Sequence, residues 1–69
     1  MKATGLFARR KRAGITLPDF AKRLGVYPHT VQNIEHGIIG IDEDTYGVMV
    51  ATIEAMEAER ARAKETVAV

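Results

Sequence analysis

Amide and imidazole side chains gather between residues 29 and 36 of this 69-residue chain. Asn and Gln can each form two hydrogen bonds with the edge of adenine, and His can donate to guanine or to a phosphate. If the segment is helical, Val31 and Ile34 turn inward and a polar face lies opposite them. That face carries His29, Asn33 and His36, with Gln32 at its edge. Its chemistry suits the major groove of duplex DNA, and an ordinary solvated helix surface is the alternative interpretation.

Positively charged side chains flank this polar face. Phosphate contacts need only cationic or amide donors at its edges. The candidates are Arg9, Arg12, Lys22, Arg23 and His36, together with the amides of Gly37 and Ile38. The two histidines could also be read as metal ligands, but no Cys or close carboxylate completes a tetrahedral set, so neither a metal nor a cofactor is expected.

The net charge of +1 conceals a division of charge along the chain. Residues 1–36 carry seven Lys or Arg against two carboxylates, whereas residues 37–69 carry three against seven. The first part therefore has the charge of a surface that faces a polyanion, although the run from Arg9 to Arg12 could equally be a solvated helix face. The chain has no Cys, no Ser and no phosphate-cradling glycine loop, so enzyme activity is not expected.

Residues 16–37 place these side chains on two short helices. Phe20 and Leu24 form one apolar stripe at helical spacing, and Val31 and Ile34 form another. Too few residues separate the stripes for anything but a tight turn. Gly25 sits where the first helix must end in a left-handed residue, which glycine adopts at almost no cost.

Capping residues mark where both helices begin. Thr16 and Asp19 have the spacing of a capping box, and Pro18 and Pro28 suit first turns whose amides need no partner. Ala21 is small enough to let the second helix approach the first closely. Residues 16–37 therefore predict a helix-turn-helix.

At these residues the chain resembles the lambda-repressor and Cro type of helix-turn-helix, over roughly Leu6 to Ile53. The resemblance rests on Ala21, Gly25, Val31 and the run Ile34-Glu35-His36-Gly37. It implies a small all-α domain and places His29, Gln32 and Asn33 at base-reading positions, with Tyr27 and Thr30 beside them. The chain departs from the family in having Leu17 where Gln is frequent, in having Tyr27 and Pro28 where a small polar cap and a polar residue are usual, and in lacking a visible fifth helix.

A first helix is predicted from Gly5 to Ala13, with Thr4 as its cap and Gly14 as its stop. Leu6, Arg10 and Ala13 share one face of it, which places an arginine on the side that packs against the core. A buried charge needs a partner. Glu35 lies beside the apolar stripe of the second motif helix, and the resemblance also implies a buried Arg–Glu pair, so we expect Arg10 to bind Glu35.

A last, long helix is predicted from Glu43 to Lys64, about 33 Å at 1.5 Å per residue. Asp42 is its expected cap, and Glu57 with Arg60 and Glu59 with Arg62 are expected ion pairs along it. Its core face consists of Tyr46, Met49, Val50, Ile53 and Met56. Opposite lies a seam of Val48, Ala51, Ala55 and Ala58, which is either a homodimer contact or a surface of good helix formers.

These features predict one all-α domain of about four helices over residues 1–64, with a tail at residues 65–69. No segment has the apolar length needed to span a bilayer, and the first residues lack a signal-peptide core, so the protein is expected in the cytoplasm of a bacterial or phage-infected cell. The main hypothesis is a dimeric repressor of double-stranded DNA whose two copies read half-sites one helical turn apart. The alternative is a protein-interaction module of the antitoxin or anti-repressor type. No small-molecule ligand is evident.

Overall fold

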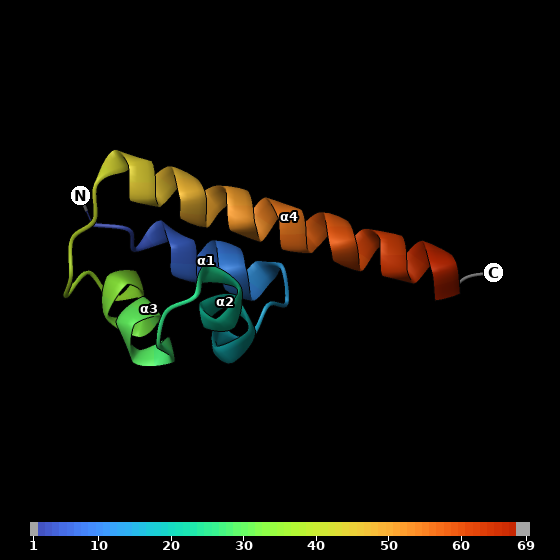
Figure 1. Ribbon diagram of the computed structural model, residues 1–69, viewed down its shortest axis with the longest axis horizontal. Helices are drawn as coiled ribbons and strands as arrows, with labels where there is room; N and C mark the ends of the chain where they lie inside the picture. The colour runs from blue at the N-terminus through green and yellow to red at the C-terminus, as the bar shows by residue number, and fades with distance from the viewer. Residues whose placement is uncertain (1, 68–69) are drawn as a thin grey trace.

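A computed structural model describes residues 2–67 of the chain. This part of the chain folds into four helices without strands, namely α1 (Gly5–Arg12), α2 (Leu17–Leu24), α3 (Pro28–Glu35) and α4 (Glu43–Val67). The three short helices lie along one side of the long α4 (Figure 1). The prediction of a small all-α helix-turn-helix domain with a long last helix is confirmed.

Thr16 and Gly25 delimit α2 as the sequence predicts. The Thr16 side chain accepts a hydrogen bond from the Asp19 amide at 3.3 Å. Gly25 has φ +77°, and the next amide, that of Val26, donates to the Ala21 carbonyl at 3.0 Å. Pro28 occupies the first turn of α3. Local sequence therefore fixes both ends of the tight turn between α2 and α3.

The end of α1 brings an additional residue into the core. Gly14 has φ +74°, and the Ile15 amide turns back to donate to the Arg10 carbonyl at 3.1 Å. Ile15 is consequently only 2% exposed. At the other end of α1 the sequence prediction is wrong, because Thr4 has helical backbone angles and its side chain caps nothing.

The core lies where α1, α2 and α3 meet the inner face of α4. Phe20, Ala21, Val31 and Ile53 are fully buried there. Along α4, Met49 is also buried, whereas Tyr46, Val50 and Met56 pack partly buried at its edge. The predicted core face of the long helix therefore is the one that packs against the helix-turn-helix.

Asp42 begins α4. Its carboxylate accepts a hydrogen bond from the Thr45 amide at 2.7 Å, and the contacts with Thr45 hold the pKa of Asp42 below its ordinary value. The helix continues to Val67, three residues beyond the predicted Lys64. Residues 68–69 of the predicted tail lie outside the described residues. Within residues 2–67, no helix combines the length and apolar character that crossing a membrane requires.

Candidate nucleic-acid interface

A buried ion pair fixes α3 against α1. Arg10 donates through Nε to Glu35 Oε2 at 2.7 Å and through Nη2 to Oε1 at 3.1 Å. Its third contact runs from Nη1 to the Ile15 carbonyl at 2.8 Å. The side chains of Arg10 and Glu35 are only 5% and 1% exposed. The structure thus brings together the two residues that the helical spacing pairs.

The geometry of this pair matters for the opposite face of α3. A guanidinium that binds a carboxylate with two parallel hydrogen bonds fixes orientation as well as distance. Because Glu35 points inward, α3 has no acidic side chain on its outer surface. The one carboxylate that could repel a phosphate backbone from this helix is neutralised inside the protein.

The outer surface of α3 carries the predicted base-reading side chains. His29 and Gln32 are exposed, and Thr30 and Asn33 are half-buried at its margins. Tyr27, just before the helix, is 74% exposed and its ring stacks on His29 with centroids 5.9 Å apart. We call His29, Gln32 and Asn33, with Tyr27 and Thr30 beside them, the reading face.

His36 follows α3 and lies beside α1. Its exposed ring contacts the edge of Phe7, with centroids 6.1 Å apart. The guanidinium carbon of Arg10 lies 5.6 Å from the centre of the same Phe7 ring. His36 therefore is accessible at the end of α3 while its ring is held against α1.

The amides of Gly37 and Ile38 are not available for the phosphate contacts predicted from the sequence. They donate to the carbonyls of Ile34 at 3.1 Å and Asn33 at 2.9 Å. The left-handed Gly37, at φ +74°, turns the chain so that its amides satisfy the last carbonyls of α3. The two amides therefore cap α3, and the prediction that they bind DNA phosphates is wrong.

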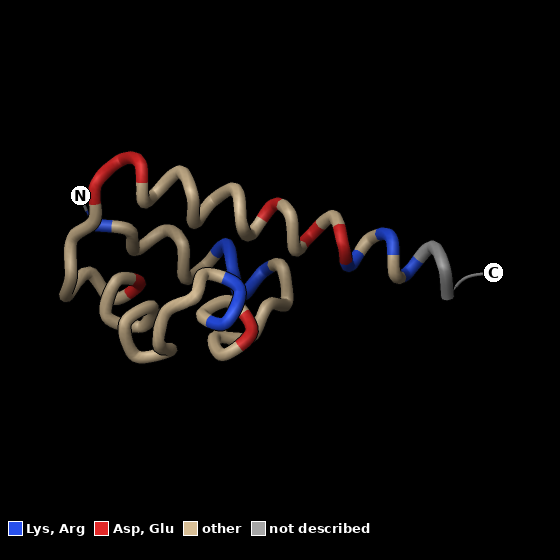
Figure 2. The backbone as a smooth tube through the Cα atoms, in the orientation of Figure 1, with Lys and Arg blue, Asp and Glu red and all other residues tan. Residues whose placement is uncertain are grey.

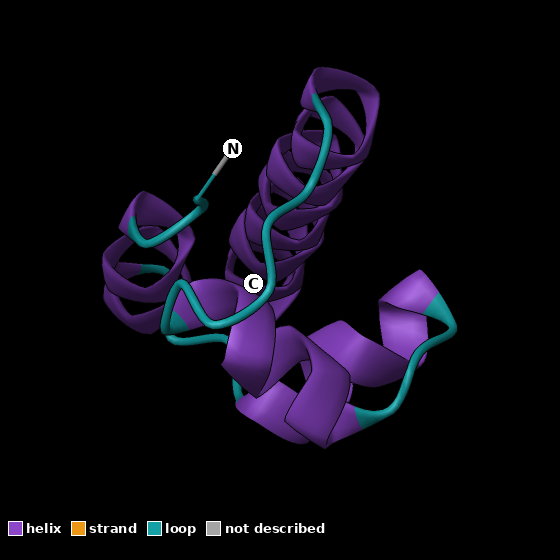
Figure 3. Cartoon of the chain, turned by 90° about the vertical axis from the view of Figure 1, so that its left-hand side faces the viewer, coloured by secondary structure: helices purple, strands orange, loops and turns teal. Residues whose placement is uncertain are grey.

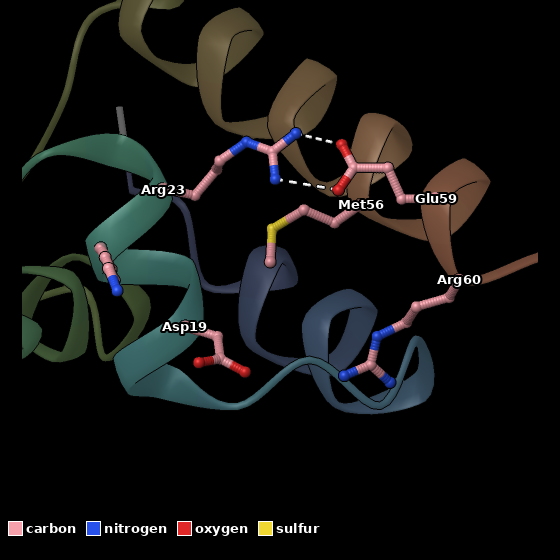
Figure 4. A pocket seen from close by; sticks show the side chains of 6 residues that line it. Asp19, Arg23, Met56, Glu59 and Arg60 are labelled. Atoms are coloured by element: carbon pink, nitrogen blue, oxygen red, sulfur yellow. Dashed lines mark hydrogen bonds and ion pairs between the residues drawn. The ribbon is translucent and has the colours of Figure 1, made fainter. Parts of the chain in front are cut away.

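Two of the four predicted phosphate-binding arginine and lysine side chains contact α4. Arg23 binds Glu59 through both terminal nitrogens, one of them 3.0 Å from its carboxylate oxygen (Figure 4). This contact raises the pKa of Arg23 and lowers the pKa of Glu59. Arg9 reaches Glu57 at 4.0 Å. The division of charge along the sequence thus partly serves the packing of the short helices on α4 (Figure 2).

The other two basic side chains remain at the surface. Arg12 is exposed at the end of α1, and Lys22 is exposed on α2. Lys22 lines an open groove of about 510 Å³ between α2 and α4, together with Asp19, Arg23, Met56, Glu59 and Arg60 (Figure 4). The acceptors Glu57 and Glu59 were expected to pair with arginines of their own helix. Only the packing of α4 on α1 and α2 places them beside Arg9 and Arg23.

The predicted seam lies on the far side of the molecule from α3. Val48, Ala51, Ala55 and Ala58 are all exposed, opposite the face of α4 that contacts α1 and α2. Among the described helices, the backbone of α3 packs against those of α1 and α2 and not directly against that of α4. Figures 1 and 3 show α3 and α4 on opposite sides of the fold.

Comparison with known proteins identifies the family. A profile described as a helix-turn-helix domain matches residues 6–63. Neither the curated proteins nor the solved structures gave a match. The profile covers all of α1 except its first residue, the whole of α2 and α3, and most of α4. The chain therefore belongs to the lambda-repressor-like helix-turn-helix family, a membership that points to a DNA-binding regulator.

Proposed function

We propose that this protein is a sequence-specific transcriptional repressor that inserts α3 into the major groove of double-stranded DNA. The observation that carries the proposal is the reading face, where amide and imidazole groups are accessible while the only carboxylate of α3 is buried against Arg10. Direct readout needs side chains that donate and accept hydrogen bonds at base edges. Occupying an operator would exclude polymerase from it.

The residues divide into two roles in this proposal. His29, Gln32 and Asn33 read base edges, and Tyr27 and Thr30 contact the duplex beside them. Phosphates are held by exposed cations, namely Arg12 and Lys22, with His36 at the end of α3. Arg9 and Arg23 would contribute less, because each already lies against a carboxylate of α4. Such a regulator works in the cytoplasm and needs no cofactor.

Selection of bound fragments from random duplex DNA tests the proposal. We expect a single recovered sequence motif and an affinity that falls steeply with added salt, since cations that neutralise phosphates release counterions. Failure to enrich any sequence, with binding that is insensitive to salt, would contradict it.

Single substitutions then separate reading from phosphate binding. Asn33→Ala should cost about 1–3 kcal/mol at one base position of the selected site and little on unrelated DNA. Lys22→Ala should weaken binding to all sequences alike. Lys64→Ala is the matched control, because it removes the same charge from the distant end of α4. Equal losses on selected and unrelated DNA for Asn33→Ala would reject its reading role.

A protein-interaction module is the second candidate, and one observation favours it. The outer side of α4 is exposed as far as residue 64, and it faces away from α3. If α4 alone carried the function, substitutions on the reading face would leave partner binding unchanged and duplex DNA would not bind at all.

A further inference from the structure

Tyr27 occupies the position directly before α3, where a capping side chain would stabilise the helix. Its backbone has the extended angles of such a cap, φ −74° and ψ 145°, but its side chain makes no capping hydrogen bond. Ser, Thr, Asn and Asp are the residues that stabilise a helix from this position. Tyr27 is also 74% exposed, so it does not belong to the core. Neither capping nor core packing therefore explains a tyrosine here.

The aromatic ring of Tyr27 lies against the imidazole of His29. The two ring centroids are 5.9 Å apart and the ring planes differ by 19°, which is an offset-stacked arrangement. Pro28 between them fixes its own φ and confines Tyr27 to extended backbone angles. Both aromatic residues are exposed, and stacking limits the positions that the imidazole nitrogens can take. We call Tyr27 and His29 the aromatic platform.

An apolar surface adjoins the aromatic platform at the turn between α2 and α3. Gly25, Val26 and Tyr27 line an open recess there of about 270 Å³. Val26 is 42% exposed. Gly25 leaves the recess open, because a Cβ added to it would meet no atom beyond its chain neighbours within 4 Å. The beginning of α3 therefore presents apolar groups directly beside a hydrogen-bonding imidazole.

Few base edges match an apolar surface beside a hydrogen-bond donor. In the major groove, thymine presents its C5 methyl group, and guanine presents two neighbouring acceptors, N7 and O6, whereas adenine has a donor next to N7. The first residues of a recognition helix are those that contact base edges. Successive base pairs are about 3.4 Å apart, so rings 5.9 Å apart can reach bases within two base pairs of each other.

We propose that the aromatic platform reads a thymine that lies within two base pairs of a guanine. Tyr27, with Val26 beside it, contacts the thymine methyl group, and the stacked His29 donates a hydrogen bond to N7 or O6 of the guanine. Tyr27 is thus a specificity-determining residue for thymine and a positioning residue for His29. This inference rests on the proposed DNA-binding function and names the bases that the reading face recognises.

The free protein tests the stack. In nuclear magnetic resonance spectra, the Tyr27 ring current should shift the imidazole protons of His29 away from their random-coil positions. Tyr27→Phe should retain this shift and Tyr27→Ser should remove it. Tyr27→Ser should nevertheless unfold at no lower urea concentration than wild type, because serine can supply the missing cap. His29 signals that are identical in wild type and Tyr27→Ser would overturn the stack.

Base analogues in the selected duplex test the reading. Each thymine is replaced by deoxyuridine, which lacks only the methyl group, and each guanine by 7-deazaguanine or 6-thioguanine, which remove N7 and O6 in turn. We expect wild type to lose affinity about three- to fivefold at one thymine, and about fivefold with one of the two analogues at a guanine within two base pairs of it. Tyr27→Ser should lose the thymine response and weaken the guanine response, whereas Tyr27→Phe should retain both.

Two further variants separate the two rings from each other and from the rest of the surface. His29→Ala should lose the guanine response and retain most of the thymine response. Val48→Ser is the matched control, because it removes an apolar side chain that is 60% exposed on α4 rather than beside α3. It should retain both responses.

A wild type that binds thymine and deoxyuridine alike at every position would overturn the inference, as would a thymine response that Tyr27→Ser leaves unchanged. In both cases a recovered sequence motif would leave the proposed function standing. If selection recovers no motif, the proposed function fails and the reading of thymine and guanine fails with it, whereas the spectra still decide whether Tyr27 positions His29.

Discussion

Two arginine–glutamate pairs join helices in this protein, and their surroundings differ. The Arg10–Glu35 pair ties α1 to α3 with side chains 5% and 1% exposed. The Arg23–Glu59 pair ties α2 to α4 with side chains 45% and 43% exposed. A buried charge cannot be solvated when its partner is removed, whereas water and salt replace the partner of an exposed one. We therefore expect the Arg10–Glu35 pair to be essential for stability and the Arg23–Glu59 pair to contribute little to it.

This difference decides how α3 is positioned. The buried pair fixes the orientation of α3 and withdraws Glu35 from its outer surface. The exposed pair holds α2 along α4 and occupies an arginine that could otherwise contact a phosphate. The Arg10–Glu35 pair therefore orients the helix that carries the reading face. The Arg23–Glu59 pair directs the Arg23 guanidinium toward α4.

The largest effect is expected from Arg10→Ala. Glu35 would remain buried without its partner, and the Ile15 carbonyl would lose the donor 2.8 Å away. The free energy of unfolding should fall by about 3–5 kcal/mol in urea denaturation. Arg12→Ala, an exposed arginine of the same helix, should change it by less than about 0.5 kcal/mol. If the free energy of unfolding fell equally in both variants, burial of Arg10 would not explain its contribution to stability.

Replacing both members of the buried pair should recover most of this loss. In the double variant Arg10→Met and Glu35→Leu no charge stays buried, and apolar replacements of buried pairs are often neutral or stabilising. We expect stability within about 1–2 kcal/mol of wild type, because the Ile15 carbonyl still lacks its donor. Urea denaturation measures it. A double variant as unstable as Arg10→Ala would mean that Arg10 acts through packing rather than through Glu35.

The smallest effect is expected from Glu59→Gln. The contact with Arg23 lowers the pKa of Glu59, so its contribution is present above the unfolded-state pKa of about 4.3 and is lost as the pH falls through the lower folded-state pKa. The thermal midpoint of the variant should lie slightly below that of wild type at pH 7 and converge with it as the pH falls through the lowered folded-state pKa of Glu59. A difference that widens on acidification would contradict this assignment.

The sequence predicts the parts of the structure that depend on local geometry. Helical spacing places Arg10 on the buried side of α1, and the need to neutralise it leads to Glu35. Thr16 and Gly25 mark the ends of α2 because side-chain capping and left-handed backbone are local properties. Ile15 was missed, although an apolar residue directly after the helix-ending Gly14 was a signal that could have found it.

What the sequence does not predict depends on how distant helices cross. Arg23 and Glu59 are 36 residues apart, and each is exposed on its own helix, so no local pattern pairs them. The Gly37 amide is a predicted phosphate donor because it follows the polar face in the sequence, whereas in the structure it donates to the Ile34 carbonyl and caps α3. The sequence predicts the seam on α4 but not where it lies relative to α3. The arrangement of the four described helices places the seam and α3 on opposite sides of the molecule.

The central claim is that the reading face recognises DNA, and one binding comparison tests it most directly. Fluorescence anisotropy would compare wild type with the combined variant His29→Ala, Gln32→Ala and Asn33→Ala, on the selected duplex and on an unrelated one. Circular dichroism would check that both proteins are folded. We predict that the variant binds both duplexes with equal affinity, near that of wild type for unrelated DNA. A folded variant that still prefers the selected duplex as strongly as wild type would contradict the account.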